Sequence, residues 1–281
     1  MSAYWTPFSR CAVGCLTADE AQVPVSTAVL RLLALCAALL AAIPLAVVYP
    51  LLGAAERSVV ARAWCRSLLR ALDVRLAVES PPEPPAGVLV VANHISWLDV
   101  LVLGSVRPGR MLAKADVRSW PLIGAIAACA GTIFVDRTRL STLPRTVAAV
   151  STALRAGARV VAFPEGTTWC GAESGRFYPA VFQAAIDAGV PVEPVTVRYT
   201  AGGRTATAPA FLGDDPLTAS AWRVARARGL VVDVRCHPVL RPGGGRRTLA
   251  AAAAASVSDV RPHMGGLVGV HQLQVVDGHP A

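Results

Sequence analysis

The sequence predicts an α/β fold, with one domain of strands and helices preceded by a pair of N-terminal helices. From about Arg75 onward, short apolar runs alternate with longer segments of helical periodicity, which is typical of α/β domains. Before that point come an apolar segment over residues 25–55 and an amphipathic segment over 56–73. A chain of 281 residues has room for this arrangement and for terminal tails.

The composition indicates a membrane-associated protein. Hydrophobic residues make up 54% of the chain, and the mean hydropathy of +0.49 is high for a soluble protein but low for one with many membrane spans. The net charge of +9 comes with only 6% aromatic residues, and its arginines are spread along the chain without a nucleic-acid-binding motif. We therefore expect an anionic membrane surface as a partner, and no nucleic acid.

The cysteines predict free thiols in a reducing compartment. There are seven of them, and they lack the paired spacing of metal sites. Cys11 and Cys15 stand too isolated in the sequence to predict a zinc site or a redox pair. The sequence therefore predicts no metal site.

After an N-terminal tail over residues 1–24, the apolar segment 25–55 is long enough to cross a membrane. Its only charge is Arg31, and the uncharged part from Leu32 spans about 36 Å as a helix. Pro44 and Pro50 would bend it, so a re-entrant hairpin in one leaflet stays open as an alternative. Acidic residues precede the segment where a signal peptide has basic ones, so we expect it to be retained.

Residues 56–73 predict an amphipathic helix. Arg62, Arg66 and Arg70 share one face of it, which is typical of a helix on an anionic membrane surface, although an ordinary packing helix has the same pattern. Arginines are more frequent after the apolar segment than before it. This bias predicts a location in the cell membrane, with the main domain on the cytoplasmic side.

The α/β domain is expected over residues 74–240, and a flexible tail rich in alanine and glycine over 241–281. The expected strands are Val74–Val78, Val88–Val91, Met111–Ala113, Thr132–Val135, Arg159–Phe163, Val192–Tyr199 and Leu230–Cys236. The expected helices are Trp97–Gly104, Pro121–Ala130, Leu143–Ala156, Ala180–Ala188 and Leu217–Arg228.

A candidate catalytic pair follows the strand at Val88–Val91. His94 comes directly after Asn93 and is followed five residues later by Asp99, at a junction between strand and helix. A neutral imidazole whose other nitrogen faces a carboxylate can take the proton of a hydroxyl group. The same residues have a structural interpretation, with Ser96 as the N-cap of the helix and Asp99 in its first turn.

Two basic side chains are candidate anion ligands. Arg137 ends the strand of the segment Gly131–Arg137, where its planar guanidinium could hold a phosphate or form a surface ion pair with Asp136. Lys114 is the only lysine in a chain whose other basic residues are arginines, which makes it a second candidate.

Two further segments combine turn residues with polar groups. Phe163 leads into the turn Pro164–Thr167, whose carboxylate, glycine and hydroxyl could contact a ligand or could form a turn without one. Pro191 and Pro194 lie at the start of a later strand, which suits the first residue of a strand or a strand at the sheet edge.

Four of these segments, taken in order, resemble the sequence blocks of the glycerophospholipid acyltransferase family, and most of all its 1-acylglycerol-3-phosphate acyltransferase branch. They are the segments 93–99, 131–137, 163–167 and 190–195. The resemblance covers roughly residues 88–199. It implies a single mixed-sheet acyltransferase domain. It also implies transfer of a fatty acyl group from acyl-coenzyme A or acyl carrier protein to the hydroxyl of a lysophospholipid, without a metal or a bound organic cofactor.

The resemblance also implies roles for individual residues. His94 would be the general base and Asp99 would orient its ring. Arg137 would hold the acceptor phosphate with Lys114 as a second charge. Glu165, Gly166 and Thr167 would shape the acceptor pocket. The supporting residues would be Asn93, Ser96, Gly131, Phe134, Phe163, Pro164, Pro191 and Pro194.

Three alternatives stay open. Thr168 stands where many family members have arginine, so the acceptor could be a lyso-ornithine lipid in place of lysophosphatidate. A non-catalytic lipid-binding protein on the same fold would bind lipid without turnover. A metal-dependent hydrolase would use His94 and Asp99 as ligands, with His237 as the one further histidine in the expected core.

Overall fold

The computed structural model describes residues 7–17, 20–81, 83–84, 86–136 and 140–258. The strands are β1 (Arg75–Glu79), β2 (Val88–Ala92), β3 (Arg110–Lys114), β4 (Ile133–Val135), β5 (Arg159–Ala162), β6 (Val192–Ala201), β7 (Arg204–Thr205) and β8 (Leu230–Cys236). The helices are α1 (Val25–Leu40), α2 (Ala42–Val48), α3 (Ala54–Ala71), α4 (Leu98–Val106), α5 (Ile123–Cys129), α6 (Leu143–Arg155), α7 (Ala180–Ala188), α8 (Leu217–Arg226) and α9 (Arg246–Ser258). Each strand and helix expected within residues 74–240 forms, within a few residues of its expected bounds.

The strands form one mixed sheet in the order β1-β8-β6-β2-β5-β3-β4, with the short β7 paired to β6. Strands β6, β2, β5, β3 and β4 run parallel to one another, whereas β8 runs antiparallel to β6 and parallel to β1. The parallel strands therefore end at the same edge of the sheet. The mixed α/β sheet implied by the resemblance is confirmed.

Strand β2 lies at the centre of the sheet and all of its side chains are buried. Val88, Val90 and Ala92 belong to one core, and Leu89 and Val91 belong to the other. Successive side chains of a strand point to opposite faces, so a strand covered on both faces has an uninterrupted apolar sequence. This burial fixes the position of the residues that follow β2.

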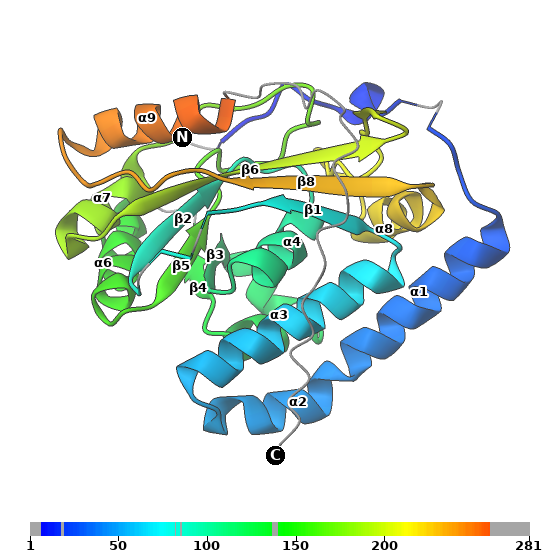
Figure 1. The fold of residues 1–281 in the computed structure, drawn as a ribbon, viewed down its shortest axis with the longest axis horizontal. Coiled ribbons are helices and arrows are strands. Elements are labelled where there is room, and N and C mark those ends of the chain that lie inside the picture. The colour runs from blue at the N-terminus through cyan, green and yellow to red at the C-terminus, as the bar shows by residue number, and fades with distance from the viewer. Residues whose placement is uncertain (1–6, 18–19, 82, 85, 137–139, 259–281) are drawn as a thin grey trace, which may run out of the picture.

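Helices cover both faces of the sheet (Figure 1). One core contains apolar side chains of α3, α4 and α8, and the other contains those of α6, α7 and α9. In Figure 1, α1 lies beside α3 and reaches α8, while the N-terminal segment crosses the top of the view before it enters α1.

The apolar segment expected over residues 25–55 forms α1, α2 and a 3-10 turn at Tyr49–Leu51. Val25–Leu51 is, among the described residues, the one helical stretch long and apolar enough to cross a membrane, with a mean hydropathy of 2.6. Ala28 and Leu35 are buried, whereas Leu30, Leu33 and other large apolar side chains are exposed. The segment thus packs by one narrow face and leaves the rest uncovered.

Helix α3 packs inside the protein more closely than a membrane-surface helix would. Leu68 and Leu69 are buried in the core shared with α4. Arg62, which was expected to face an anionic membrane, donates hydrogen bonds to the carbonyl oxygen of Val106 and to Glu83. Packing on the protein therefore accounts for Leu68, Leu69 and Arg62, whereas Val59, Arg66 and Arg70 stay exposed.

The expectation of a flexible tail from residue 241 is wrong for α9. This helix packs against β6 and α7, and it buries Leu249, Ala250, Ala253 and Val257. Alanine favours helix intrinsically, and its small side chain lets the helix approach the sheet closely. Residues 259–281 lie outside the described residues.

Strand β6 lies inside the sheet, so the expectation of an edge strand is wrong. Pro194 is tolerated within β6 because it lies where the hydrogen-bond ladder with β8 ends. The carbonyl oxygen of Pro194 accepts a 2.9 Å hydrogen bond from the His237 N–H, one position beyond the last strand pair, Val195–Cys236. The N–H and C=O groups of a strand residue point to the same side of the strand. The missing N–H of Pro194 would therefore have pointed toward β8 at the end of the ladder, so its loss removes no hydrogen bond between the paired residues. Pro191 precedes the strand and its carbonyl oxygen accepts the Leu89 N–H.

Candidate active site

The candidate catalytic pair lies at the carboxyl end of β2. The Nδ1 atom of His94 is 2.8 Å from Oδ2 of Asp99. The Asp99 side chain is fully buried, whereas that of His94 is 21% exposed. With an ionised Asp99, Nδ1 carries the ring hydrogen and donates a hydrogen bond to the carboxylate. The Nε2 atom is then the acceptor nitrogen, which is the state that a general base requires.

Asp99 also organises the backbone of the loop that carries His94. Its Oδ2 atom accepts hydrogen bonds from the N–H groups of Ile95 at 2.6 Å and Ser96 at 2.9 Å. The hydroxyl of Ser96 accepts the N–H of Leu98 at 3.2 Å, at the start of α4. The structural and catalytic interpretations of this segment are therefore compatible, because one carboxylate closes the helix start and contacts the imidazole.

Tyr199 is a site residue that the sequence did not reveal. Its hydroxyl, in the adjacent strand β6, donates a 2.7 Å hydrogen bond to Oδ1 of Asp99. Burial, reinforced by the negative charge of Asp99, raises the pKa of Tyr199 well above its usual value, so the phenol stays protonated as a donor. The one signal in the sequence is that Tyr199 is the only aromatic residue of β6.

The His94 ring is held in its plane by an aromatic neighbour. The ring of Phe163, directly after β5, stacks on it with centroids 4.0 Å apart and an angle of 13° between the planes. Because β5 is hydrogen-bonded to β2, the two strand ends bring these rings together. Phe163 is thus a supporting residue, as the resemblance implied.

Glu165 holds the loops around His94 together. Its Oε2 atom accepts the backbone N–H of His94 at 2.6 Å, and Oε1 accepts the N–H of Gly175 at 2.7 Å. Burial, together with the charge of Asp99, raises the pKa of this carboxyl group to about 7 against the two hydrogen bonds. Glu165 therefore positions His94 through the backbone, and it also lies in the wall of the cleft described below.

The turn after β5 comes close to the N-terminal segment. Gly166 has a φ of +74°, and a Cβ atom at this residue would lie 2.5 Å from a side-chain carbon of Pro7. Glycine is therefore required both by the backbone conformation and by the close approach. Pro164 is buried and its carbonyl oxygen accepts the N–H of Tyr178, while Thr167 is partly exposed.

Asn93 fastens the histidine loop to β6. Its side-chain amide donates a 2.8 Å hydrogen bond to the carbonyl oxygen of Val197 and accepts one of 2.8 Å from the Val197 N–H. The side chain thus continues the strand ladder where β2 has ended. This geometry explains why the residue before His94 is an asparagine.

Lys114, one of the two candidate anion ligands, lies at the same edge of the sheet. Lys114 ends β3 with an exposed side chain and is paired in register with Val135 at the end of β4. Strands β2 and β3 are separated by β5, which is about 10 Å at the usual strand spacing. Arg137 follows Val135 by two positions but lies outside the described residues.

Two residues of the Gly131–Arg137 segment have structural roles. Gly131 has a φ of +74°, with the Arg110 side chain 3.3 Å from the place of a Cβ atom. The guanidinium of Arg118 lies over the ring of Phe134, 5.6 Å from its centroid. Gly131 therefore suits the turn that leads into β4, and Phe134 lies within the strand.

A cleft of about 350 Å³ opens beside the histidine loop. Glu165, Trp169 and Gly175 form part of its wall, and Arg10 and Arg176 add positive charge. The backbone N–H of Trp169 donates a 2.8 Å hydrogen bond to the carbonyl oxygen of His94, which joins this wall to the catalytic loop. The two arginines carry no signal in the sequence that distinguishes them from the others.

The geometry does not support metal ligation by the histidines. Nδ1 of His94 faces Asp99, and Nε2 of His237 lies 2.8 Å from the hydroxyl of Thr196 in a different part of the sheet. Within the part of the chain that the structure describes, one group of side chains lies close enough together to hold a metal ion, and it consists of three cysteines.

Comparisons with known proteins show the family. Residues 75–198 match the family model described as Acyltransferase. The chain is 40% identical over 172 residues to a 1-acyl-sn-glycerol-3-phosphate acyltransferase of Neisseria meningitidis, which covers 60% of this chain and 67% of the relative. It is 36% identical over 203 residues to a lyso-ornithine lipid O-acyltransferase of Pseudomonas aeruginosa, which covers 70% and 76%.

A solved structure has the same fold. The 1-acyl-sn-glycerophosphate acyltransferase PlsC from Thermotoga maritima aligns with a TM-score of 0.56 and 20% sequence identity, over 72% of this chain and 76% of that one. The matched residues 75–198 contain the His94–Asp99 pair, Phe163 and the Glu165 loop. The fold, the family model and the relatives lead to one conclusion: the chain belongs to the acyltransferase family.

Proposed function

We propose that this protein is a membrane-associated O-acyltransferase that transfers a fatty acyl group from acyl-coenzyme A or acyl carrier protein to 1-acylglycerol-3-phosphate, with phosphatidic acid as the product. The observation that carries the proposal is the contact between Nδ1 of His94 and Asp99, which leaves Nε2 as the proton acceptor. Relatives named as acyltransferases of lysophospholipids and of lyso-ornithine lipid support the substrate class.

In the proposed reaction, Nε2 of His94 takes the proton from the free hydroxyl of the acceptor as its oxygen attacks the thioester carbonyl carbon. The new carbon–oxygen bond forms, the carbon–sulfur bond breaks, and the leaving thiolate takes the proton from the imidazolium. Asp99 stabilises the positive charge that His94 carries between these steps. No acyl-enzyme is required, because the acceptor oxygen attacks the donor directly.

The preference for a phosphate-bearing acceptor rests on positive charge at the carboxyl edge of the sheet. Lys114 and Arg137 follow two neighbouring parallel strands. A doubly ionised phosphate that leaves water needs more than one compensating charge. Lysophosphatidate offers this phosphate close to its free hydroxyl, so one acceptor could reach both His94 and the basic residues.

A second candidate acceptor is lyso-ornithine lipid. The relative with this activity in its name aligns over 203 residues at 36% identity, a longer stretch than the 172 residues of the Neisseria relative. Its acceptor carries no phosphate, so the same base would act with a different head-group site.

Membrane association is supported by the uncovered surface of α1 and α2. Val25–Leu51 is predominantly apolar, with Arg31 as its one charged residue, and only 11% of its most apolar window is buried in the protein. Exposed apolar surface of this extent is unfavourable in water and suits the interior of a bilayer. We place the protein in the cell membrane, with the acyltransferase domain on its cytoplasmic side, because arginines follow the apolar segment more often than they precede it.

An acceptor panel tests the proposal. Full-length protein in detergent would be given acyl-coenzyme A or acyl carrier protein, with radiolabelled lysophosphatidate, lysophosphatidylethanolamine or lyso-ornithine lipid. We expect phosphatidic acid as the fastest product. Faster acylation of lyso-ornithine lipid would overturn the head-group assignment, and binding of every lipid without turnover would indicate the non-catalytic alternative.

A further inference from the structure

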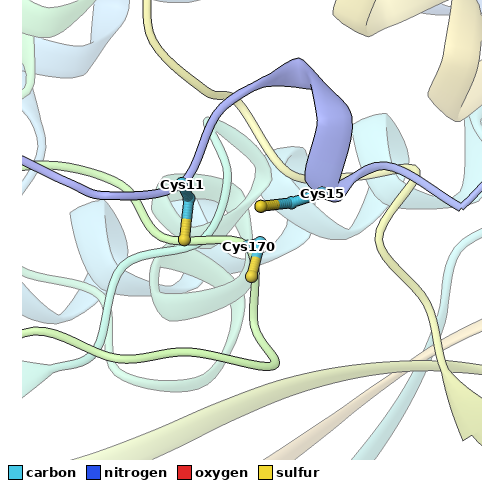
Figure 2. Close-up of side chains that lie close together, drawn as sticks. All are labelled: Cys11, Cys15 and Cys170. Carbon is cyan, nitrogen blue, oxygen red and sulfur yellow. The ribbon is translucent and has the colours of Figure 1, made fainter.

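Three cysteines from two distant parts of the chain meet beside the catalytic loop. Cys11 and Cys15 belong to the N-terminal segment, and Cys170 belongs to the loop that follows β5. Their sulfur atoms all lie within 4.8 Å of one another (Figure 2). Cys11 and Cys170 are buried, and Cys15 is partly exposed.

The backbone brings the first two thiols together. Val13–Cys15 forms a single 3-10 turn, closed by a 2.8 Å hydrogen bond from the Cys15 N–H to the carbonyl oxygen of Ala12. This turn directs Cys15 back toward Cys11, and Figure 2 shows the side chain of Cys15 pointing from the turn toward the other two.

Cys170 is held in place by the catalytic loop. It directly follows Trp169, whose N–H donates to the carbonyl oxygen of His94. The next residue, Gly171, has a φ of +88°, and a Cβ atom there would lie 3.2 Å from the side chain of Ile95. The third thiol therefore sits on a segment packed directly against the loop between His94 and Asp99.

Three converging thiols supply three of the four ligands of a tetrahedral zinc ion. Zinc binds thiolates at about 2.3 Å in a tetrahedron, so the sulfur atoms of one site lie about 3.8 Å apart. The observed separations, all within 4.8 Å, need only small side-chain movements to reach this value. Thiolates are soft ligands that select zinc over magnesium or calcium. A disulfide, in contrast, would use two of the three sulfur atoms and leave the third without a function.

We propose that Cys11, Cys15 and Cys170 bind a zinc ion that fastens the N-terminal segment to the catalytic loop. Three thiols lose their protons on binding, and water or an external thiol occupies the fourth position on the exposed side of Cys15. The metal is structural and takes no part in acyl transfer. Pro7 against Gly166 is a second contact between the same two segments.

This site explains why Cys11 and Cys15 looked isolated in the sequence. The third ligand lies far along the chain, and only the fold brings it to the N-terminal segment. Other contacts support the same arrangement, since Glu20 accepts hydrogen bonds from the N–H groups of Thr207 and Ala208. The segment before α1 thus lies across the domain, and the zinc ion would anchor its beginning.

The metal content of the purified protein tests the site. Full-length protein would be purified in detergent under reducing conditions without a metal-affinity step, and zinc would be measured by mass spectrometry. We expect about one zinc ion per chain, reduced to background in Cys11→Ser, Cys15→Ser and Cys170→Ser. Cys129→Ser and Cys236→Ser, which change an exposed and a buried cysteine elsewhere, should keep the metal.

A metal titration of the wild-type protein tests the site independently of whether the variants fold. Wild-type protein stripped with a chelator and shown to be folded by circular dichroism would be titrated with ZnCl₂ or CoCl₂. We expect a cobalt–thiolate charge-transfer band and protection of three thiols from alkylation. A folded wild-type protein that binds neither metal, or that contains a disulfide between two of these cysteines under the same reducing conditions, would overturn the proposal.

Hydrogen exchange tests the role of the metal. Removal of zinc from the wild-type protein should increase amide exchange in residues 7–17 and in the loop around Cys170, and added ZnCl₂ should reverse the change. Exchange in α6, which is remote from the three cysteines in the fold, should stay constant. If zinc binds but exchange in residues 7–17 is the same with and without it, the fastening role is wrong.

Discussion

The Tyr199 hydroxyl donates a 2.7 Å hydrogen bond to the same carboxylate of Asp99 that contacts His94. The two oxygens of Asp99 thereby have separate tasks, because Oδ1 accepts the tyrosine while Oδ2 accepts the imidazole and two backbone N–H groups. A carboxylate held by this many donors has one orientation. Tyr199 therefore positions His94 through Asp99.

Replacement of Tyr199 by phenylalanine should lower kcat more than it changes KM for the acceptor. The hydrogen bond to Oδ1 is lost without the loss of the ring, so the orientation of Asp99 becomes less fixed. We expect a loss of about 5-fold to 30-fold, equivalent to about 1 to 2 kcal/mol for one hydrogen bond to a charged group. Steady-state kinetics with the pH profile of kcat checks this, and an unchanged profile would contradict the positioning role.

Asp99→Asn should reduce acyl transfer by about 100-fold to 10,000-fold, since the substitution removes the charge that stabilises the imidazolium. The amide keeps the size of the carboxylate, so the fold should persist. Asp187→Asn, at an exposed residue on α7, is the matched control and should have wild-type activity. Equal rates for the two variants would show that the carboxylate of Asp99 is not needed.

Glu165→Gln should change the pH dependence of stability. Burial raises the pKa of Glu165 to about 7 from a model-peptide value of 4.5. Between these pH values the folded protein holds a proton that the unfolded chain has lost, so the free energy of unfolding falls as the pH rises. The fall amounts to at most about 1.4 kcal/mol per pH unit.

The glutamine variant lacks this titration, so its stability relative to wild type should increase from pH 4.5 to pH 7 and level off above. Chemical denaturation in detergent at several pH values measures both proteins. If the free energies of unfolding of the two proteins change with pH in the same way, Glu165 has an ordinary pKa and the prediction is wrong.

Arg107→Met should destabilise the fold strongly. Arg107 and Glu193 form a buried ion pair in which Nε of Arg107 donates to both carboxylate oxygens, at 3.0 and 3.1 Å. Removal of the arginine leaves Glu193 buried without its charge partner, which costs about 3–5 kcal/mol. The double variant Arg107→Met with Glu193→Leu should recover most of the loss. If the double variant loses as much stability as the two single variants added together, as measured by denaturation midpoints, the coupling between Arg107 and Glu193 is contradicted.

The contact between His94 and Asp99 could be predicted from the sequence because it is local. The two residues lie within one turn of a strand-to-helix junction, and the apolar run before them fixes where the strand ends. The positions of Asn93 and Phe163 next to this pair follow in the same way, since each directly follows a buried strand. Local sequence determines the ends of β2 and β5, and hydrogen bonding between these strands brings the two ends side by side.

Contacts between distant segments could not be predicted in the same way. Tyr199 reaches Asp99 only because β6 is the neighbour of β2, and the order of strands in the sheet does not follow the order in the chain. Cys170 meets Cys11 for a similar reason. The two backbone N–H groups that the carboxylate of Glu165 accepts also belong to separate loops, so the sequence does not show these contacts.

Two patterns have more than one physical origin. The alanine-rich stretch before Ser258 was expected to be a tail, but α9 uses its small side chains to pack on β6 and α7. The arginine face of residues 56–73 is typical of a helix on a membrane surface, but Arg62 contacts the end of α4 and Glu83, whereas Arg66 and Arg70 are exposed. Amphipathicity alone does not distinguish packing on protein from packing on lipid.

The activity of His94→Ala tests the central claim most directly. The variant and wild type would be assayed in detergent with acyl-coenzyme A and labelled lysophosphatidate, with folding checked by circular dichroism and His237→Asn as the control for a histidine outside the site. Loss of the general base should lower kcat by at least about 100-fold, with the control near wild type. A folded His94→Ala protein with kcat within about 10-fold of wild type would contradict His94 as the base.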